Sequence, residues 1–293
     1  MLQVDRLTRQ FGDHVAVDGV SFDVPDGQLV GFVGGNGAGK TTTMRMIMGV
    51  LAIHGGEVRV DGRPITAADR RTFGYMPEER GLYPKQRIVD QLVYLGRLHG
   101  MSNAQARSRT LEYLERFGLA DRAKDHVEKL SLGNQQRVQI IAAVMADPTL
   151  LILDEPFSGL DPAAVDQMAD VLREQTRRGV PILFSSHQLD LVDRLSDSIV
   201  ILAKGRVVAA GTPDGLRAGA AVRHRLVLSG DAGWTRDLPG IHVADVEGSS
   251  AVVEILTPGA ERDLLAQALS RGTVHAYAPI VPPLSEIYRE VTA

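Results

Sequence analysis

The chain has 293 residues, of which 44% are hydrophobic, and its formal net charge is −4. This length suits one large domain with a small one, or two ordinary domains, each with its own core. The small charge and the lack of a dense Lys/Arg run argue against a nucleic-acid partner. With 0 cysteines, disulfide bonds and thiolate metal sites are excluded, and a cytosolic location is mildly favoured.

The chain carries neither a recognisable export signal nor a stretch long enough to span a membrane. Residues 1–5 begin with strand-like alternation rather than with a basic region and an apolar core. The most apolar segments, 138–146, 150–153 and 199–203, all fall short of the roughly 20 residues that a membrane span needs. If the protein works at a membrane, we expect another chain to supply the span.

The first 60 residues predict a strand-rich α/β lobe. We expect strands at residues 2–7, 16–24 and 29–33, and a helix over 41–51. Residues 55–62 predict a further strand that ends in an Asp-Gly turn.

A glycine-rich loop joins the third strand to the helix. Its glycines let successive backbone N–H groups point at a phosphate, while Lys40 supplies a positive charge and the Thr41 hydroxyl can ligate Mg²⁺. A simple Gly-rich turn is the alternative, but the complete pattern directly after an apolar strand favours a nucleoside triphosphate. Kinases, GTPases, helicases and transport ATPases share this loop, so the rest of the chain must choose among them. The loop residues are Gly34, Gly35, Asn36, Gly37, Ala38, Gly39, Lys40, Thr41 and Thr42.

The middle of the chain changes to a helical pattern. Within residues 88–146, Leu92, Leu95 and Leu98 recur at spacings of three, and Leu111 begins a second such series. We predict a helical subdomain, about residues 80–147, between two halves of the α/β core.

The core resumes at residues 150–153, a continuous apolar run expected of a buried parallel strand. A helix over 163–178 and a second buried strand at 181–184 complete a βαβ unit. Residues 198–203 and 206–210 flank Lys204-Gly205 and predict a hairpin.

Two acidic residues, Asp154 and Glu155, follow the strand at 150–153. An α/β sheet places ligand groups at this end of its strands. One acid can hold Mg²⁺, and the next can orient or deprotonate an attacking water. In isolation the pair could belong to a turn or a helix start, but beside a phosphate loop the catalytic interpretation is favoured.

After residues 211–215 the composition shifts to Gly and Ala over 218–221, which indicates a domain boundary. We predict a small α+β accessory domain over residues 222–293. Its expected elements are strands at 224–228, 242–246 and 251–256, a helix at 261–269, a strand at 273–280 and a helix at 283–291.

The segment Leu130-Ser131-Leu132-Gly133-Asn134-Gln135-Gln136-Arg137 resembles the LSGGQQQR signature of the ATP-binding subunits of ABC transporters. Leu132 and Asn134 stand where that family most often has Gly and Gln. The resemblance implies that Ser131 and Gly133 meet a γ-phosphate at a helix N-terminus, a chemistry that both departures leave possible. A plain Ser-capped helix would have the same local pattern.

Further matches follow in the family's order. Phe11 resembles the aromatic residue that stacks on adenine, and His187 resembles the switch histidine that contacts the γ-phosphate. Asp161, in Ser-Gly-Leu-Asp, matches the loop that passes between two subunits, although the same residues suit a turn that caps the next helix. In the segment 74–80, Glu78 stands where the family usually has glutamine, and we predict that it senses the metal and links it to a transmembrane partner.

The resemblance covers residues 1–215 and implies a P-loop NTPase core of ABC type, with an antiparallel β lobe and the inserted helical subdomain. It also implies ATP and Mg²⁺ as cofactors, and a second copy or a homologous ATP-binding subunit that completes the site. In these roles Glu155 positions the water and His187 contacts the γ-phosphate. The implied metal ligands are Thr41, Glu78 and Asp154.

Residues 282–291 resemble the tail of a small accessory domain in bacterial exporter ATPases, whose type-2 permease is a separate multi-span polypeptide. Export of a drug, an ion or a lipid-like substrate is therefore implied, with the protein cytoplasmic and peripheral on the inner face of the membrane. A generic dimerisation or regulatory role of that domain is an alternative. Two rival functions are a soluble ABC-type ATPase with a regulatory, non-transport role, and a P-loop kinase. A kinase would need neither the 131–137 element nor His187.

Overall fold

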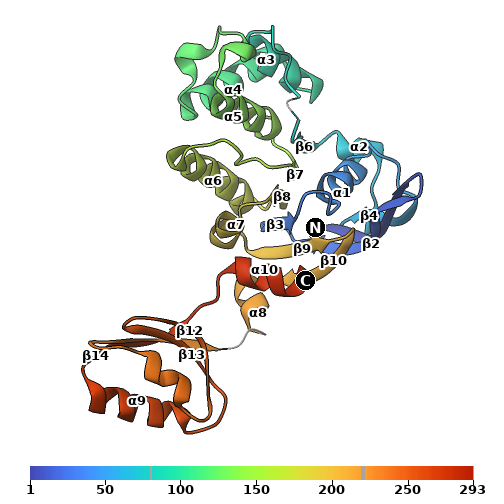
Figure 1. Cartoon of the computed structure of the whole chain (residues 1–293). Helices are drawn as coiled ribbons and strands as arrows, with labels where there is room; N and C mark the ends of the chain where they lie inside the picture. The colour runs from blue at the N-terminus through green and yellow to red at the C-terminus, as the bar shows by residue number, and fades with distance from the viewer. Residues whose placement is uncertain (80, 219–221, 293) are drawn as a thin grey trace. The chain divides into compact units, whose positions relative to one another are not determined.

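The computed structural model describes residues 1–79, 81–218 and 222–292. Arg80, where the predicted helical subdomain begins, residues 219–221 of the predicted boundary, and Ala293 lie outside the described residues. The chain divides into two compact units (Figure 1): the first contains Met1–Pro213, and the second contains Asp214–Ile287. Residues 288–292 group with the first unit.

The first unit is built on a six-stranded sheet in the order β10-β9-β3-β8-β7-β6. Neighbouring pairs from β9 to β6 are parallel, and β10 pairs antiparallel with β9. Every residue of β3, β7 and β8 is buried, which explains their continuous apolar runs. The strands are β3 (Leu29–Gly34), β6 (Phe73–Met76), β7 (Leu150–Leu153), β8 (Ile182–Ser186), β9 (Ser198–Ala203) and β10 (Arg206–Gly211).

A second sheet of this unit is antiparallel, with the order β2-β1-β4-β5. Its apolar side chains share one core with the main sheet, where the rings of Phe22 and Phe32 lie 5.0 Å apart. The first strand is longer than predicted and runs to Phe11. The strands are β1 (Leu2–Phe11), β2 (His14–Val24), β4 (Gly55–Val60) and β5 (Arg63–Pro64).

Three helices connect strands of the core: α1 (Lys40–Ile47), α6 (Pro162–Arg177) and α7 (Leu189–Leu195). The predicted helix over 41–51 was too long. Gly49 has φ 72°, a left-handed conformation that terminates a helix, so α1 ends at Ile47.

The helical subdomain contains α3 (Ile88–Leu98), α4 (Asn103–Arg116) and α5 (Leu132–Val144), which Figure 1 shows gathered at one end of the first unit. Leu92 is fully buried, whereas Leu98 is 64% exposed. Six residues advance a helix by about 600°, which places Leu98 well away from the buried stripe. A repeat of three therefore predicted the helices correctly but only part of their buried faces.

The second unit has an antiparallel sheet, β12-β13-β11-β14, with α9 packed on one face (Figure 1). Its core includes Leu226, Val253 and Leu264. The guanidinium of Arg223 pairs with Glu254 at 2.7 Å and also with Glu286 of the last helix. Its sheet and covering helix consist of β11 (Arg223–Leu228), β12 (Ile241–Glu247), β13 (Ser250–Ile255), α9 (Ala260–Arg271) and β14 (Val274–Ile280). Two further helices span the boundaries between the units in the sequence, α8 (Pro213–Arg217) and α10 (Leu284–Thr292).

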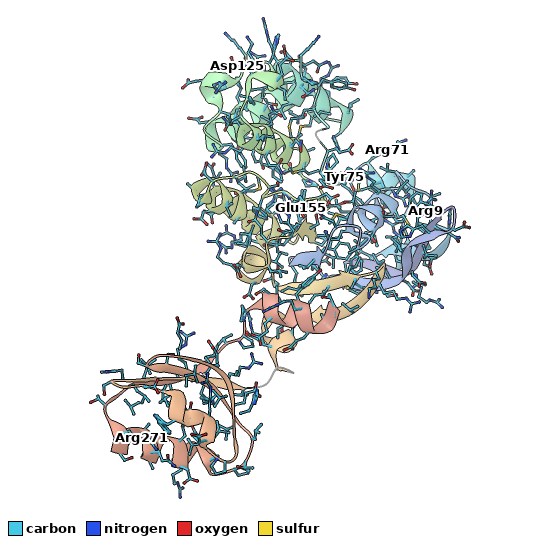
Figure 2. The ribbon with its side chains drawn as sticks, viewed as in Figure 1. Arg9, Arg71, Tyr75, Asp125, Glu155 and Arg271 are labelled. Atoms are coloured by element: carbon cyan, nitrogen blue, oxygen red, sulfur yellow. The ribbon has the colours of Figure 1, made fainter. Side chains whose placement is uncertain are left out.

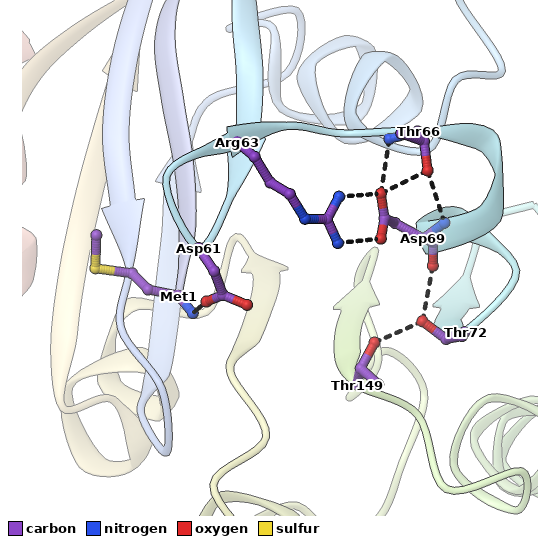
Figure 3. Close-up of polar contacts among 7 residues, drawn as sticks. All are labelled: Met1, Asp61, Arg63, Thr66, Asp69, Thr72 and Thr149. Carbon is purple, nitrogen blue, oxygen red and sulfur yellow. Dashed lines mark hydrogen bonds and ion pairs between the residues drawn. The ribbon is translucent and has the colours of Figure 1, made fainter.

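A polar network fixes the turn that leads into β6 (Figure 3). The short helix α2 (Ala67–Arg70) starts with a capping box between Thr66 and Asp69. Arg63 donates two hydrogen bonds to the Asp69 carboxylate, at 2.8 and 2.7 Å. The hydroxyls of Thr72 and Thr149 lie 2.7 Å apart and join the turn to the residue before β7. The network helps hold β6, and therefore the segment that follows it, beside β7.

The Asp69 network gives a pH-dependent contribution to stability. Hydrogen bonds from Arg63, and then from Thr66, hold the pKa of the Asp69 carboxyl well below its ordinary value of 3.8. Because the folded pKa is depressed, the stabilisation is complete above about pH 4 and is lost as the pH falls towards the folded pKa. We expect Asp69→Asn to lower the melting temperature at pH 7, and this deficit to shrink as the pH falls below about 4.

Melting curves of the wild type and the variant between neutral and acidic pH measure this difference. The exposed Asp121 serves as control, and Asp121→Asn should leave the melting temperature unchanged. A deficit for Asp69→Asn that is the same at every pH would contradict the assignment to the carboxylate charge.

Candidate functional site

The residues that follow β3 and β7 line a cavity of about 510 Å³. It contains the predicted loop residues from Asn36 to Thr42, whereas Gly34 and Gly35 lie just before it in the chain. Phe11, Glu78 and the acidic pair, which are far apart in sequence, also reach it. Its lining is Phe11, His14, Ala16, Asn36, Gly37, Ala38, Gly39, Lys40, Thr41, Thr42, Glu78, Asp154 and Glu155.

The glycine-rich loop wraps around the ammonium group of Lys40. The side chain is only 9% exposed, and Nζ donates to the carbonyls of Gly34 at 2.7 Å and Gly35 at 3.3 Å. Gly39 has φ 107°, and a Cβ there would stand 2.7 Å from the carbonyl oxygen of Ala16. Only glycine fits that position. The turn at Gly39 leads directly into α1, so the N-terminus of this helix and its backbone N–H groups lie at the cavity.

The two acids after β7 are held by one hydroxyl. Ser185, buried at the end of β8, donates to Asp154 Oδ1 at 2.5 Å and accepts from the backbone N–H of Glu155 at 2.8 Å. Asp154 is 1% exposed, and its Oδ2 finds no hydrogen-bond partner among the described residues. Burial, and then the negative charge of Asp154, raises the pKa of the nearby Tyr75 phenol.

Glu155 lies at the centre of the first unit (Figure 2). Its backbone has φ 51°, a left-handed conformation that is uncommon for a residue with a side chain and that concentrates at functional sites. The carboxylate is 13% exposed, and its Oε2 lies 2.9 Å from Nδ1 of His187, which is 60% exposed. The structure thus brings together the two residues that the sequence predicted to be catalytic.

A second cavity of about 420 Å³ shares Asn36, Glu78 and Glu155 with the first. Glu78 is exposed, at the end of the segment that follows β6. It lines the first cavity together with Asp154 and Glu155, and the second together with Glu155, so its predicted role as a metal-sensing residue stays a prediction. The other lining residues are Leu132, Gln136, Ser158, Gly159 and His187.

Ser131 and Asp161 act as helix caps within this chain. The Ser131 hydroxyl accepts from the N–H of Asn134 at 3.4 Å at the start of α5, and Asp161 Oδ1 accepts from Ala164 at 2.9 Å at the start of α6. Among the described residues that line the cavity of the glycine-rich loop, neither these two nor Gly133 is found. Their neighbour Leu132 lines the smaller cavity instead, together with Asn36 of the glycine-rich loop.

Phe11 ends β1 and is 44% exposed, with the guanidinium of Arg9 4.7 Å from the ring centre. An exposed ring at the cavity offers a stacking surface for a base. His14 and Ala16, on β2, also line this cavity. The sequence did not predict them, because the start of this strand carries no motif. Sequence reasoning also missed the role of Ser185, although a serine that ends an apolar strand was an available signal.

Comparison with known proteins places this geometry in a family. Residues 17–158 match the ABC transporter family, and residues 211–292 match the C-terminal domain of DrrA1-3-like ATP-binding proteins. The chain is 40% identical to the uncharacterized ABC transporter ATP-binding protein YhaQ of Bacillus subtilis (strain 168) over 291 residues, covering 99% of this chain and 98% of that protein. The chain belongs to the ATP-binding proteins of ABC transporters.

Other relatives of this ABC ATP-binding protein agree. It is 36% identical over 218 residues to the Nod factor export ATP-binding protein I of Paraburkholderia xenovorans (strain LB400), with 73% of this chain and 72% of that protein covered. A solved structure of the ATP-binding subunit of an ABC transporter matches with a TM-score of 0.69 at 35% identity, covering 74% of this chain and 92% of that one. The predicted fold class and family are confirmed, and the protein is an ATPase.

Among the described residues, no helix has both the length and the apolar character needed to cross a membrane.

Ser185 of this ABC ATPase offers a direct test of the acidic pair. Ser185→Ala leaves Oδ1 of the buried Asp154 carboxylate and the N–H of Glu155 without their present partner, a loss of about 1–3 kcal/mol for each unpaired group. If that loss falls on the geometry needed for hydrolysis, kcat for ATP should drop about 10- to 100-fold.

Steady-state ATP hydrolysis at saturating ATP measures the effect. Ser186→Ala is the matched control, because the Ser186 hydroxyl accepts a local bond from the N–H of Gln188 at 3.0 Å and contacts neither Asp154 nor Glu155 among the hydrogen bonds of the described residues. An equal loss in both variants would show that Ser185 has no special role.

Proposed function

We propose that this ABC ATP-binding protein drives export of a drug, an ion or a lipid-like substrate through a separate multi-span permease of type 2. The match of residues 211–292 to the DrrA1-3-like C-terminal domain carries the exporter part of the proposal. The name of the Nod factor export relative supports the same direction. Such a permease would hold the protein at the cytoplasmic face of the membrane. In this proposal residues 1–215 are the ATP-binding domain and 222–293 the accessory domain.

The proposed ATP site uses the larger cavity. The Lys40 ammonium, now held by two carbonyls, would exchange them for oxygens of the β- and γ-phosphates. The backbone of the loop from Gly34 to Thr42 would cradle the phosphates, and the exposed Phe11 ring would stack on adenine.

Mg²⁺ fits the residues present. The buried Oδ2 of Asp154 has no hydrogen-bond partner among the described residues, and Thr41 and Glu78 add hydroxyl and carboxylate oxygens to the same cavity. Such oxygen donors, together with phosphate oxygens, suit this ion. When bound, the ion neutralises charge on the phosphates.

Glu155 would perform the proton chemistry. Its carboxylate accepts a proton from the attacking water, whose oxygen bonds to the γ-phosphorus while the bond to the β-phosphate oxygen breaks. His187 Nδ1, 2.9 Å from Glu155 Oε2, orients that carboxylate and leaves Nε2 to contact the γ-phosphate.

A second subunit would complete the site. Ser131 and Gly133 lie at the N-terminus of α5 and are not among the described residues that line the cavity of their own phosphate loop, which supports a role toward the ATP of a partner. The partner is a second copy of this chain or a homologous ATP-binding subunit, with Asp161 near the contact between them. ATP then joins two chains, and loss of the γ-phosphate releases them.

The two-subunit site predicts an ATP-dependent dimer. Glu155→Gln removes the proton acceptor but keeps the size of the side chain, so bound ATP persists and its γ-phosphate contacts hold the chains together. We expect sedimentation to show a monomer without nucleotide and a dimer with saturating ATP and Mg²⁺. Adding Lys40→Ala should abolish this dimer. A Glu155→Gln variant that stays monomeric with bound ATP would contradict a homodimeric composite site.

Purification from gently solubilised membranes tests the transport role. We expect a multi-span protein to accompany the tagged chain, and high salt, which disrupts only weak surface adsorption, to leave the complex intact. Reconstitution of that complex in proteoliposomes would then identify the cargo. A chain recovered only in the soluble fraction, without a membrane partner, favours the regulatory, non-transport ATPase instead.

A further inference from the structure

The helix that starts with the signature motif is tied to the acidic pair of its own chain. Gln136, in the second turn of α5, donates from Nε2 to the carbonyl of Glu155 at 2.8 Å and to the carbonyl of Pro156 at 3.0 Å. Both acceptors are carbonyl oxygens, so only the NH₂ group of the amide can serve them, and its two hydrogens suffice for both. Gln136 also lines the smaller cavity together with Glu155 and His187.

Two neighbours of Gln136 contact the same loop. A Cβ on Gly133 would stand 3.1 Å from the carbonyl oxygen of Gly159, a tight distance, so the helix and the loop approach closely at this glycine. Arg137 Nη2 lies 3.8 Å from Asp161 Oδ2. Gly133, Gln136 and Arg137 are spaced i, i+3 and i+4, which places them on one face of α5. The start of α5 therefore contacts the loop after β7 at three positions on one face of the helix.

Gln136 acts where the backbone of Glu155 is strained. The φ of 51° at Glu155 must be maintained by its surroundings. Ser185 holds the N–H of this residue at 2.8 Å, and Gln136 holds its carbonyl at 2.8 Å. Side chains from β8 and α5 thus fix the two sides of the residue whose carboxylate faces His187.

We propose that Gln136 is a positioning residue that couples the two ATP sites of a dimer. The inference rests on the proposed two-subunit arrangement, in which Ser131 and Gly133 meet the partner's ATP. When that ATP draws the N-terminus of α5 into place, Gln136 transmits the position to Glu155, which acts on the ATP of its own chain. Glu155 of a chain therefore supports hydrolysis of that chain's own ATP only when the start of α5 in the same chain is bound to the ATP of the partner.

The test separates turnover from binding. Gln136→Met keeps the length of the side chain but removes both hydrogen bonds, and we expect kcat to fall about 10- to 100-fold while the KM for ATP changes less than about twofold. The dependence of the rate on ATP should also lose positive cooperativity, because the two sites no longer communicate.

Gln139→Met is the matched control. Gln139 lies one turn further along α5, is 4% exposed, and its amide atoms have no hydrogen-bond partner among the described residues. The same substitution there should leave kcat within about twofold and cooperativity intact. Unchanged kcat in Gln136→Met, or an equal loss in both variants, would overturn the proposal.

A charged variant gives a second readout. In Gln136→Glu an ionised carboxylate faces two carbonyl oxygens, whereas the protonated form can donate to one of them. At neutral pH the kcat of this variant should therefore fall at least as far as that of Gln136→Met. A Gln136→Glu variant with wild-type kcat would indicate that Gln136 only fills space, and would overturn the positioning role.

Dimer formation distinguishes this inference from the function on which it rests. In the Glu155→Gln background, Gln136→Met should still dimerise with ATP, since Ser131 and Gly133 remain in place. If the double variant loses the dimer while Glu155→Gln alone forms it, Gln136 serves the interface and the coupling proposal fails. If Glu155→Gln alone does not dimerise, the proposed function itself is wrong.

Discussion

The hydroxyl of Ser185 joins the ends of two buried strands. By donating to Asp154 and accepting from the N–H of Glu155, it fixes the acid that follows β7 against β8. Parallel strands bring these ends to the same edge of the sheet, and the phosphate loop follows β3, which pairs with β8. The cavity, the acidic pair and His187 all take their positions from this junction.

The left-handed backbone of Glu155 lies at that junction. A strained residue persists only where its surroundings specify it fully, and here α5 and β8 do so from opposite sides. Since α5 also begins with the signature residues, the start of this helix is hydrogen-bonded to the acidic pair of its own chain. In the proposed dimer this anchoring links binding by one chain to chemistry in the same chain.

Much of the fold could be predicted because its elements have strong local patterns. The continuous apolar runs of β3 and β7 and the turn residues Lys204-Gly205 marked the main sheet correctly. The predictions failed where a single residue outweighed the pattern: Gly49 ended α1 early, and Leu98 left the buried stripe. The short strand β6 (Phe73–Met76) was not predicted as a strand, since its four residues carry no alternation of their own and are stabilised by pairing with β7.

By itself the sequence determined the phosphate loop, the acidic pair, the signature segment and the family, because these depend on residue types at fixed spacings along the chain. Only the tertiary structure decided which side chains meet. Sheet order and helix packing place Glu78 in two cavities with Glu155. They also bring Ser185 to Asp154 and Gln136 to the carbonyl of Glu155. Hydrogen bonds between residues separated by 19 or 31 positions leave no local pattern, since their geometry exists only once the strands have paired.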